Sequence, residues 1–525
     1  MSTENTRLLT LLLAANQQHL LRQGCKGLEK ESLRLGADGM IAHTPHPPGF
    51  GSALTHPWIT TDYSEALLEL ITPPFQDSAA TLVFLRNIHG FIHRHLNNEV
   101  LLATSMPIGL AGDESVPIAN YGTSNIGRMK RIYRNGLSYR YGRTMQSIAG
   151  IHFNYSVNEA LWPVLKDLTE DSNTLSAFIS EQYFGAVRNV HRYGWLLIYL
   201  FGNSPAICSS FFKGREALAD KFQRFDETTL YRPHATSLRM SDIGYRNDNQ
   251  TSLDISFNNL DEYVACLQAA INKPYPPYEK IGIKVGEEYR QLNANILQIE
   301  NEYYSLIRPK QVARSGEKPT LALKKRGVRY IELRALDLNC FEPAGVSIDT
   351  MHFLEVFVLF CLLKESPPLS TEERAESSRN ALSVACCSRT KGFRLFRAGR
   401  DIPLAQWANH ILDGMLEVAQ ILDEDTTTRP YTGSVLMQRA AITDPEQGPA
   451  ARVLREMRNN GESFAEFAWR LSQEHAQYWL NQPLDPAVES QFRQSAADSR
   501  LKQAEIEAAD TLSFEEFLQA YMNQD

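Results

Sequence analysis

The sequence predicts an α+β protein, with a β-sheet in the first two thirds of the chain and a mainly helical C-terminal region. Two observations support this fold class. Four stretches between residues 27 and 337 place carboxylates or other polar groups on strand-like segments. From about residue 345 onward, the apolar residues recur at helical spacing. We therefore expect a core with helical insertions in residues 1–345, and a helical region in residues 346–525 that packs on it.

The stretch GVRYIELRALD, residues 327–337, is the clearest strand. Its side chains alternate between two faces, and β-branched and aromatic residues after a glycine favour a strand over a helix. One face is mostly apolar and can pack on a core. The other face carries Glu332 and Arg334, about 6.6 Å apart along the strand. A salt bridge between these two residues is the simple alternative to a functional role for Arg334.

Two further stretches repeat this arrangement. GLEKESLRL (27–35) and TMQSIAGIHFNYSV (144–157) both alternate like strands. Glu29 and Glu31 share one face of the first stretch, and Gln146, His152 and Asn154 share one face of the second. Facing carboxylates repel one another unless cations lie among them. We therefore expect a sheet whose concave face is hydrated, acidic and able to bind divalent metal.

The stretch TTDYSEALLELITPP (60–74) permits two interpretations. On a helix, the spacing brings Asp62, Glu65 and Glu69 together. On a strand, alternation aligns Glu65 and Glu69. The leucine-rich ending before two prolines favours a strand for the second half.

Carboxylates and one imidazole from these stretches form a set of hard metal ligands. Its six members are Glu29, Glu31, Asp62, Glu69, His152 and Glu332. Oxygen-rich ligation suits Mg²⁺ or Mn²⁺, and the lack of thiolates argues against a structural zinc site. Magnesium sites of this kind usually hold nucleotide phosphates, and Arg334 is placed to neutralise charge on a transferred phosphoryl group. A second pocket for a small amino acid can be assembled from Tyr133, Tyr245, Tyr304 and Arg239, although each residue type is also common in ordinary structural roles.

Composition excludes several classes of protein. The net charge of −8 argues against nucleic acid as the main ligand. No apolar run approaches the length of a membrane span. The N-terminal leucine cluster lacks the net positive charge of a signal peptide and predicts an amphipathic first helix. The seven cysteines are scattered without a C-x-x-C pair, which is typical of reduced thiols in a cytoplasm.

Three smaller patterns complete the analysis. His89 and His93, in a predicted helix over residues 77–98, have a spacing that can hold zinc, but no third ligand is in view, so we interpret them as a half-exposed helix face. The segment YGTSNIGRM (121–129) resembles a phosphate loop without its lysine and without a preceding strand, so we reject that motif. Ser513 and Glu516 predict a capping box at the start of a final helix.

Many ordered segments make the sequence similar to bacterial glutamate–cysteine ligases. They include GLEKESLR, GSALTHPWITTDYSEALLELITP, YGTSNIGRMKRIYRNGLSYRYG, MQSIAGIHFNYS, LQIENEYYSLIRPK and RYIELRALDLNCF. The resemblance is close over residues 20–350 and looser in the helical C-terminal part. It implies a glutamine-synthetase-like fold, in which antiparallel strands form a funnel surrounded by helices.

The resemblance also implies roles for individual residues. The six hard ligands above match positions that hold a cluster of Mg²⁺ ions, and Arg334 matches the arginine at the γ-phosphate. The positions that match the pocket around the cysteine side chain are Tyr63, Tyr133, Leu137, Gln146 and Tyr245. Arg239 and Tyr304 match the groups that bind the cysteine carboxylate. Position 63 departs from the family pattern, which has Phe, and its hydroxyl would make the thiol pocket more polar and loosen selectivity for cysteine.

The implied reaction consumes ATP and joins the γ-carboxylate of L-glutamate to the amine of L-cysteine through a γ-glutamyl phosphate, the first step of glutathione biosynthesis. Glu332 and Arg334 are the expected catalytic residues, Mg²⁺ is the expected metal with Mn²⁺ as a substitute, and a cytoplasmic monomer is expected. The same fold and chemistry with another amine acceptor is the first alternative. A metal-dependent phosphohydrolase and a catalytically inactive binding partner are the others.

Overall fold

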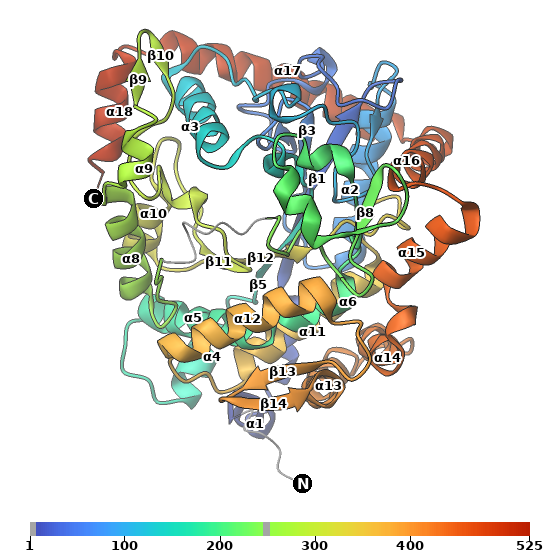
Figure 1. The fold of residues 1–525 in the computed structure, drawn as a ribbon. Coiled ribbons are helices and arrows are strands. Elements are labelled where there is room, and N and C mark those ends of the chain that lie inside the picture. The colour runs from blue at the N-terminus through green and yellow to red at the C-terminus, as the bar shows by residue number, and fades with distance from the viewer. Residues whose placement is uncertain (1–6, 245–252, 525) are drawn as a thin grey trace.

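A computed structural model describes residues 7–244 and 253–524 of the chain. Its centre, within those ranges, is a seven-stranded sheet in the order β11-β12-β5-β1-β3-β2, with β4 paired to β1 (Figure 1). The strands are β1 (Cys25–Leu35), β2 (Ile59–Thr61), β3 (Leu67–Ile71), β4 (Val100–Leu101), β5 (Ile151–Ser156), β11 (Ile307–Lys310) and β12 (Tyr330–Leu336). All of their pairings are antiparallel. Antiparallel strands with helices around them confirm the predicted fold class.

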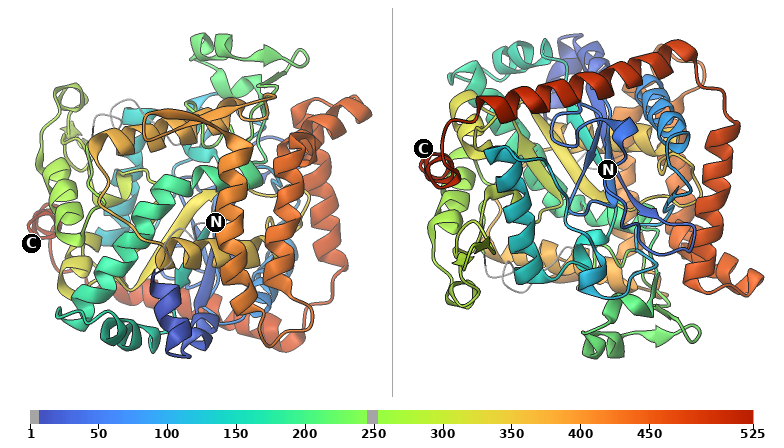
Figure 2. Two further views of the ribbon diagram at one scale, coloured as in Figure 1. Left: turned by 90° about the horizontal axis from the view of Figure 1, so that it is seen from below. Right: turned by 90° about the horizontal axis from the view of Figure 1, so that it is seen from above.

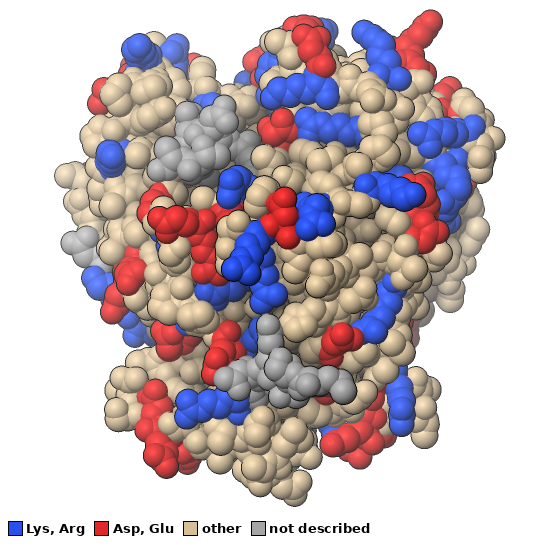
Figure 3. All heavy atoms as spheres, turned by 60° about the horizontal axis from the view of Figure 1, so that its bottom comes forward, with Lys and Arg blue, Asp and Glu red and all other residues tan. Residues whose placement is uncertain are grey.

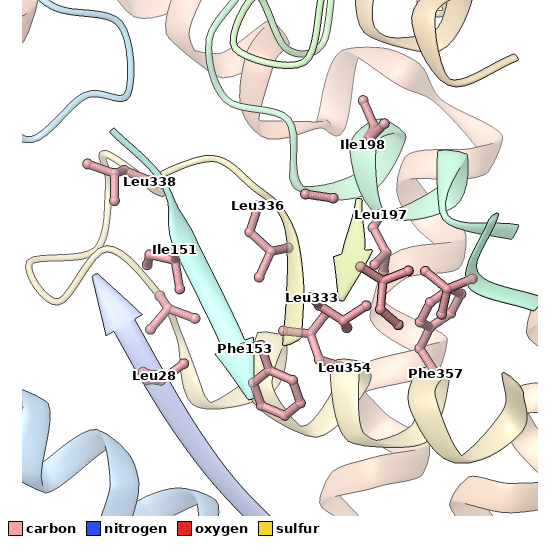
Figure 4. Packing of buried hydrophobic residues seen from close by; sticks show 14 of the residues in the cluster. Leu28, Ile151, Phe153, Leu197, Ile198, Leu333, Leu336, Leu338, Leu354 and Phe357 are labelled. Atoms are coloured by element: carbon pink, nitrogen blue, oxygen red, sulfur yellow. The ribbon is translucent and has the colours of Figure 1, made fainter. Parts of the chain in front are cut away.

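One face of this sheet is apolar and covered by helices. Those helices are α2 (Ser78–His93), α5 (Leu175–Tyr193), α6 (Trp195–Phe201) and α11 (Ile348–Leu363). Helix α2 contacts β1 and β3, α5 contacts β11 and β12, and α11 contacts β5 as well as both α2 and α5. Leu28, Phe153 and Leu333, one from each of three adjacent strands, point into this core (Figure 4). Because side chains alternate along a strand, their neighbours Glu29, His152 and Glu332 lie on the opposite face.

The C-terminal region is mainly helical, as predicted. After α11 it contains α12 (Thr371–Cys387), α13 (Leu404–Leu422), α14 (Pro430–Thr443), α15 (Pro449–Asn460), α16 (Phe464–Asn481), α17 (Pro486–Ala509) and α18 (Phe514–Met522). The hairpin of β13 (Arg394–Arg397) and β14 (Arg400–Pro403) interrupts the helices, and its short strands were missed by the helical interpretation. One hydrophobic cluster includes residues from both sides of residue 345, and the boundary at that residue stays a prediction.

The remaining elements lie around the other face, at the edges of the sheet and outside the helices of the apolar face (Figure 2). The helices are α1 (Arg7–Ala14), α3 (Asn125–Tyr141), α4 (Leu161–Leu168), α8 (Leu260–Asn272), α9 (Pro276–Glu279) and α10 (Pro319–Arg326). The strands are β6 (Ala206–Cys208), β7 (Gln223–Arg224), β8 (Thr229–Tyr231), β9 (Lys284–Val285) and β10 (Glu288–Tyr289). Helix α1 buries Leu9 and Leu12, which confirms an amphipathic first helix.

Three sequence interpretations need correction. The strand predicted over residues 144–157 is only β5, because residues 145–147 form a 3₁₀ turn that is followed by an extended connection. Residues 60–74 are a β-hairpin, so the predicted strand in the second half is confirmed, but the first half is a strand and a tight turn. His89 and His93 are buried, not half-exposed, and the His89 ring stacks on Trp479.

One smaller prediction, the capping box, is confirmed. Ser513 and Glu516 form a reciprocal capping box at the start of α18. The structure describes all seven cysteines, and none is bonded to another. Among the described helices, none has the length and apolar character that crossing a membrane requires. On the face drawn in Figure 3, basic and acidic side chains are interspersed and do not gather into one extended basic surface.

Candidate active site

Strand register brings the predicted acidic residues together on the polar face of the sheet. Glu29 on β1 lies opposite His152 on β5, and Glu31 on β1 lies opposite Glu69 on β3. Glu332 on β12 lies opposite Asn154, the next residue of β5 on the same face. Three neighbouring strand pairs therefore place four carboxylates and one imidazole side by side.

His152 lies at the centre of this group. Its Nδ1 atom is 3.2 Å from Glu29 Oε2 and 3.6 Å from Glu332 Oε1, and its Nε2 atom is 3.6 Å from Glu31 Oε1. One ligand atom from each of Glu29, His152 and Glu332 can be chosen so that all lie within 4.8 Å of one another. This spacing suits several ligands around a single cation.

Burial makes the negative charge on this face costly. Burial and the neighbouring Asp62 raise the pKa of Glu31 to about 8. Burial, followed by the charges of Glu29, Asp62 and Glu31, raises the pKa of Glu69 well above its usual range. Asp62 lies in the turn between β2 and β3, where its charge acts on Glu31 and Glu69. A turn therefore brings Asp62 to the site, and not the helix or the single strand that the sequence permitted. A cation bound among these groups would relieve this electrostatic cost.

The donor set fits a hard divalent metal ion. The groups are carboxylate oxygens and one imidazole nitrogen, the ligand types expected for Mg²⁺ or Mn²⁺. The buried Nε2 atom of His152 has no hydrogen-bond partner. Unpartnered buried polar atoms are uncommon in folded proteins and often mark the position of a bound ion or water.

Cationic side chains lie on the β11–β12 side of the group. Arg334 Nη1 donates to Glu332 Oε1 at 3.0 Å and lies 3.4 Å from His152 Nδ1. Lys310 Nζ is 3.2 Å from Glu332 Oε2. Although burial opposes ionisation, Lys310 and Arg334 together hold the pKa of Glu332 well below its usual range. The salt bridge anticipated as an alternative role for Arg334 is present, and it keeps the guanidinium at the edge of the carboxylate group.

Two of the basic residues were not assigned to the site from the sequence. Arg308 lies opposite Glu332 in the β11–β12 register, and burial together with the nearby Arg334 lowers its pKa. Lys310 follows two residues later, on the same strand face. The signal is present in the sequence as Arg308 and Lys310 at a spacing of two, just ahead of the central strand.

The residues predicted to contact an amino-acid side chain lie around α3. Tyr133 and Leu137 are one helical turn apart on α3, and Leu137 is buried. Tyr304 donates its hydroxyl to Gln146 Oε1 at 3.2 Å. Burial, followed by the charges of Glu302 and Tyr304, raises the pKa of Tyr133 well above its usual range. Tyr63 is buried at the β2–β3 turn. Tyr245 lies outside the described residues.

Arg239 connects this pocket to the acidic group. Its Nη1 atom donates to the carbonyl oxygen of Arg334 at 3.0 Å. Its guanidinium lies directly against Gly150, where a Cβ atom would collide with it. Arg239, Tyr304 and Arg334 all line one cavity of about 630 Å³, whose lining also includes residues of α12. The two predicted pockets therefore adjoin.

The turn that carries Asp62 is held by Arg134 of α3 and by Tyr121, and not by the nearby carboxylate of Glu65. Arg134 Nε donates to the carbonyl oxygen of Asp62 at 2.5 Å, and the Tyr121 hydroxyl donates to the same oxygen at 2.9 Å. Glu65, by contrast, accepts backbone N–H groups from His46 and Asn120. The Glu65 carboxylate therefore connects the loops that contain His46 and Asn120, and it does not belong to the acidic group.

Comparisons with known proteins identify relatives of this chain. A glutamate–cysteine ligase family model matches residues 9–384. A glutamate–cysteine ligase of Alcanivorax borkumensis is 48% identical over 503 residues, with 95% of each chain covered. A glutamate–cysteine ligase of Pseudomonas aeruginosa is 47% identical over 521 residues, covering 99% of this chain and 98% of that one.

Solved structures give the same result. The crystal structure of a glutamate–cysteine ligase from Francisella tularensis in complex with AMP has a TM-score of 0.89 and 35% identity, over 95% of this chain and 97% of that chain. A bifunctional glutathione synthetase from Pasteurella multocida has a TM-score of 0.70 and 27% identity, over 90% of this chain and 55% of that one. On the strength of the family model and of relatives matched along nearly their whole length, this chain belongs to the glutamate–cysteine ligase family.

Proposed function

We propose that this protein is an ATP-dependent ligase that joins the γ-carboxylate of L-glutamate to the amine of L-cysteine, the first step of glutathione biosynthesis. The observation that carries the proposal is the group of carboxylates around His152, with Arg334 at its edge, in a chain of this family. The names of the relatives and the AMP bound to the Francisella tularensis structure support the same substrates.

The chemistry requires an activated carboxylate. A glutamate γ-carboxylate is a poor electrophile at neutral pH, so its oxygen first attacks the γ-phosphorus of ATP, which forms γ-glutamyl phosphate and releases ADP. The cysteine amine then attacks the carbonyl carbon. Inorganic phosphate leaves with the electrons of the C–O bond, and the amine loses a proton. No protein nucleophile is needed.

The acidic face is proposed to hold Mg²⁺, or Mn²⁺ in its place. The proposed ligands are Glu29, Glu31, Asp62, Glu69, His152 and Glu332. When bound, such ions supply charge neutralisation between two anionic reactants. Glu332 also anchors Arg334 at 3.0 Å, and the guanidinium is proposed to bind the transferred phosphoryl group. Lys310, at 3.2 Å from Glu332, adds a second positive charge beside that group.

The pocket beside α3 is proposed to bind cysteine. Tyr304 and Arg239 are assigned to its carboxylate, and the cavity that they share with Arg334 supports a path between the two sites. The residues assigned to its side chain are Tyr63, Tyr133, Leu137, Gln146 and Tyr245. Because position 63 carries a hydroxyl that the family pattern lacks, another small amine acceptor is the alternative to test.

An acceptor-dependent assay tests the proposal. The purified protein with MgATP, L-glutamate and L-cysteine should release phosphate and form an equal amount of γ-glutamylcysteine. Replacing cysteine with α-aminobutyrate and other amines ranks the acceptors. A faster reaction with another amine would overturn the assignment of cysteine, and ATP turnover without either amino acid would indicate a phosphohydrolase.

Location and assembly belong to the same proposal. All seven cysteines are free thiols, which supports a reducing compartment such as the cytoplasm. All six proposed metal ligands come from one chain, which supports a monomer. Sedimentation at several protein concentrations would test the monomer, since a concentration-dependent mass would contradict it.

A further inference from the structure

The two last helices pack along one side of the molecule: α17 lies against α2 and the loop before β2, and α18 lies against α3. We call residues 486–524, which comprise α17, α18 and the turn between them, the C-terminal strap. Helix α17 runs over the β1–β3 side of the sheet, and α18 ends beside α3 (Figures 1 and 2). The strap lies beyond residue 384, where the match to the family model ends. Nothing in the reaction itself requires it.

The first anchor of the strap is the loop that leads into β2. Ser52 donates its backbone N–H to Ser499 Oγ at 2.9 Å, and Thr55 donates its hydroxyl to the Ser499 carbonyl at 2.5 Å. Gly51 has a φ of 80°, and a Cβ atom there would lie 2.7 Å from the Cα atom of Ala496. Only glycine fits this close approach. The helix therefore lies directly on the backbone that precedes the Asp62 turn.

The second anchor is the N-terminus of α3. Glu507 Oε1 accepts the backbone N–H of Thr123 at 2.8 Å, and Asp510 Oδ2 accepts the backbone N–H of Asn125. Asn125 returns a hydrogen bond from its side chain to the carbonyl of Leu512 at 2.9 Å. The first N–H groups of a helix have no partners within the helix, and negative charge is favourable there. The strap thus supplies partners that α3 cannot supply for itself.

The third anchor is hydrophobic. Phe514 and Tyr521 of α18 are buried in one cluster with Met129 of α3 and Leu292. Tyr133 packs against the same cluster. At the edge of the cluster, the Arg128 guanidinium lies 4.6 Å from the centre of the Phe514 ring.

Helix α3 is the element through which these anchors reach the site. It carries Tyr133 and Leu137 of the proposed acceptor pocket, and Arg134, which holds the Asp62 carbonyl at 2.5 Å. Its sequence, NIGRMKRIYRNGLSYRY, has few apolar residues with which to dock on a core. Because most helical stability in proteins comes from packing of an apolar face, α3 depends on its neighbours for its position.

We propose that the C-terminal strap is a positioning element for the acceptor pocket, with Phe514 and Asp510 as positioning residues that act on the bound amino acid through α3. This inference rests on the proposed function, because the acceptor pocket is part of it. The strap contacts α3 and the loop before β2, and also α2, Tyr289 and Lys318. None of these elements carries His152, Arg334 or Lys310, which lie on β5, β12 and β11. Loosening the strap therefore affects acceptor binding before it affects the nucleotide side of the site.

Steady-state kinetics of strap variants test this inference. Phe514→Ala and Asp510→Ala are expected to raise KM for cysteine by about tenfold and to leave KM for ATP within about twofold, because a small displacement of α3 misplaces the acceptor. Phe514→Leu should recover part of the loss by refilling the cluster. Gln519→Ala, on the exposed side of α18, is the matched control and should behave as the parent protein does.

Hydrogen exchange provides a readout that does not need activity. Amides of α3 should exchange faster in Phe514→Ala than in Gln519→Ala, while amides of β5 and β12 keep their protection. Equal rises in KM for cysteine and ATP, or unchanged exchange in α3, would overturn the inference. If the parent protein made no γ-glutamylcysteine, the proposed function would fail, yet the exchange experiment would still decide whether the strap positions α3.

Discussion

The two faces of the central sheet are built from the same strands but have different roles, one in packing and the other in the candidate active site. Leu28, Phe153 and Leu333 point into the core, and each is next in sequence to a residue of the acidic group. The core side is closed by helices that bury its apolar area, the main source of folding free energy. The polar side gathers buried carboxylates, and burial together with neighbouring negative charge raises the pKa values of two of them, Glu31 and Glu69. Substitutions at adjacent positions of one strand should therefore differ in effect: those on the polar face should lower activity, and those on the apolar face should lower stability.

The largest expected effect lies on the polar face. Glu332→Gln and Arg334→Ala should each lower turnover by about 100-fold or more, because each removes a charge that we propose to act on the transferred phosphoryl group or its metal. Circular dichroism should show an intact fold in both variants. Near-normal turnover in either variant would mean that the site has been assigned to the wrong residues.

The neighbouring core position should show the reverse. Leu333→Ala, which leaves a cavity in the packed face, should lower the free energy of unfolding by about 2–5 kcal/mol. Denaturant titration measures this change, and turnover per folded molecule should fall far less than in Glu332→Gln. Equal losses of activity in Leu333→Ala and Glu332→Gln would contradict the separate roles of the two faces.

The pH dependence of stability should sharpen the comparison. Burial and Asp62 raise the pKa of Glu31 from 4.5 to about 8 in the folded protein. The folded state then binds more protons than the unfolded state within this window, so this contribution to stability is present at low pH and is lost as the pH rises towards 8. Without metal, Glu31→Gln should gain stability over the parent by up to about 1.4 kcal/mol per pH unit across the window.

Denaturation at several pH values, with chelator and then with Mg²⁺, measures this difference. Added Mg²⁺ should stabilise the parent more than Glu31→Gln, and more at higher pH. Parallel stability curves for the two proteins would contradict the assignment of Glu31 to a strained acidic face.

The strands of the acidic face could be predicted because each carries its own local signal. Glu332 and Arg334 flank Leu333 within one short stretch, so the strand period alone predicts that their two side chains share a face. The convergence of Glu31 with Glu69 depends on register between distant strands, which no local pattern contains. The prediction grouped them by ligand chemistry and by strand faces, and the family resemblance agreed with that grouping.

Other features were not predictable from local patterns for physical reasons. Asp62 and Glu65 lie three residues apart in one hairpin, yet only Asp62 reaches the site, because Glu65 is held by backbone groups of two loops. Gln146 lies in a 3₁₀ turn, where strand alternation does not apply. The contacts of Asp510 and Phe514 with α3 join segments nearly 400 residues apart, beyond the range of any local signal.

The smallest expected effect concerns the acceptor pocket. Tyr63→Phe restores the family pattern and removes a buried hydroxyl, so it should increase the preference for cysteine over α-aminobutyrate by about two- to tenfold. Competition between the two acceptors, with products separated by chromatography, measures the preference. An unchanged ratio would mean that the Tyr63 hydroxyl does not face the acceptor side chain.

Direct titration with Mn²⁺, followed by electron paramagnetic resonance, tests the central claim that the acidic face binds divalent metal. The parent protein should bind Mn²⁺, Glu29→Gln and Glu332→Gln should each weaken binding by about tenfold or more, and Glu65→Gln, a carboxylate variant outside the group, should bind as the parent does. Equal binding by all four proteins, or none by the parent, would contradict the account.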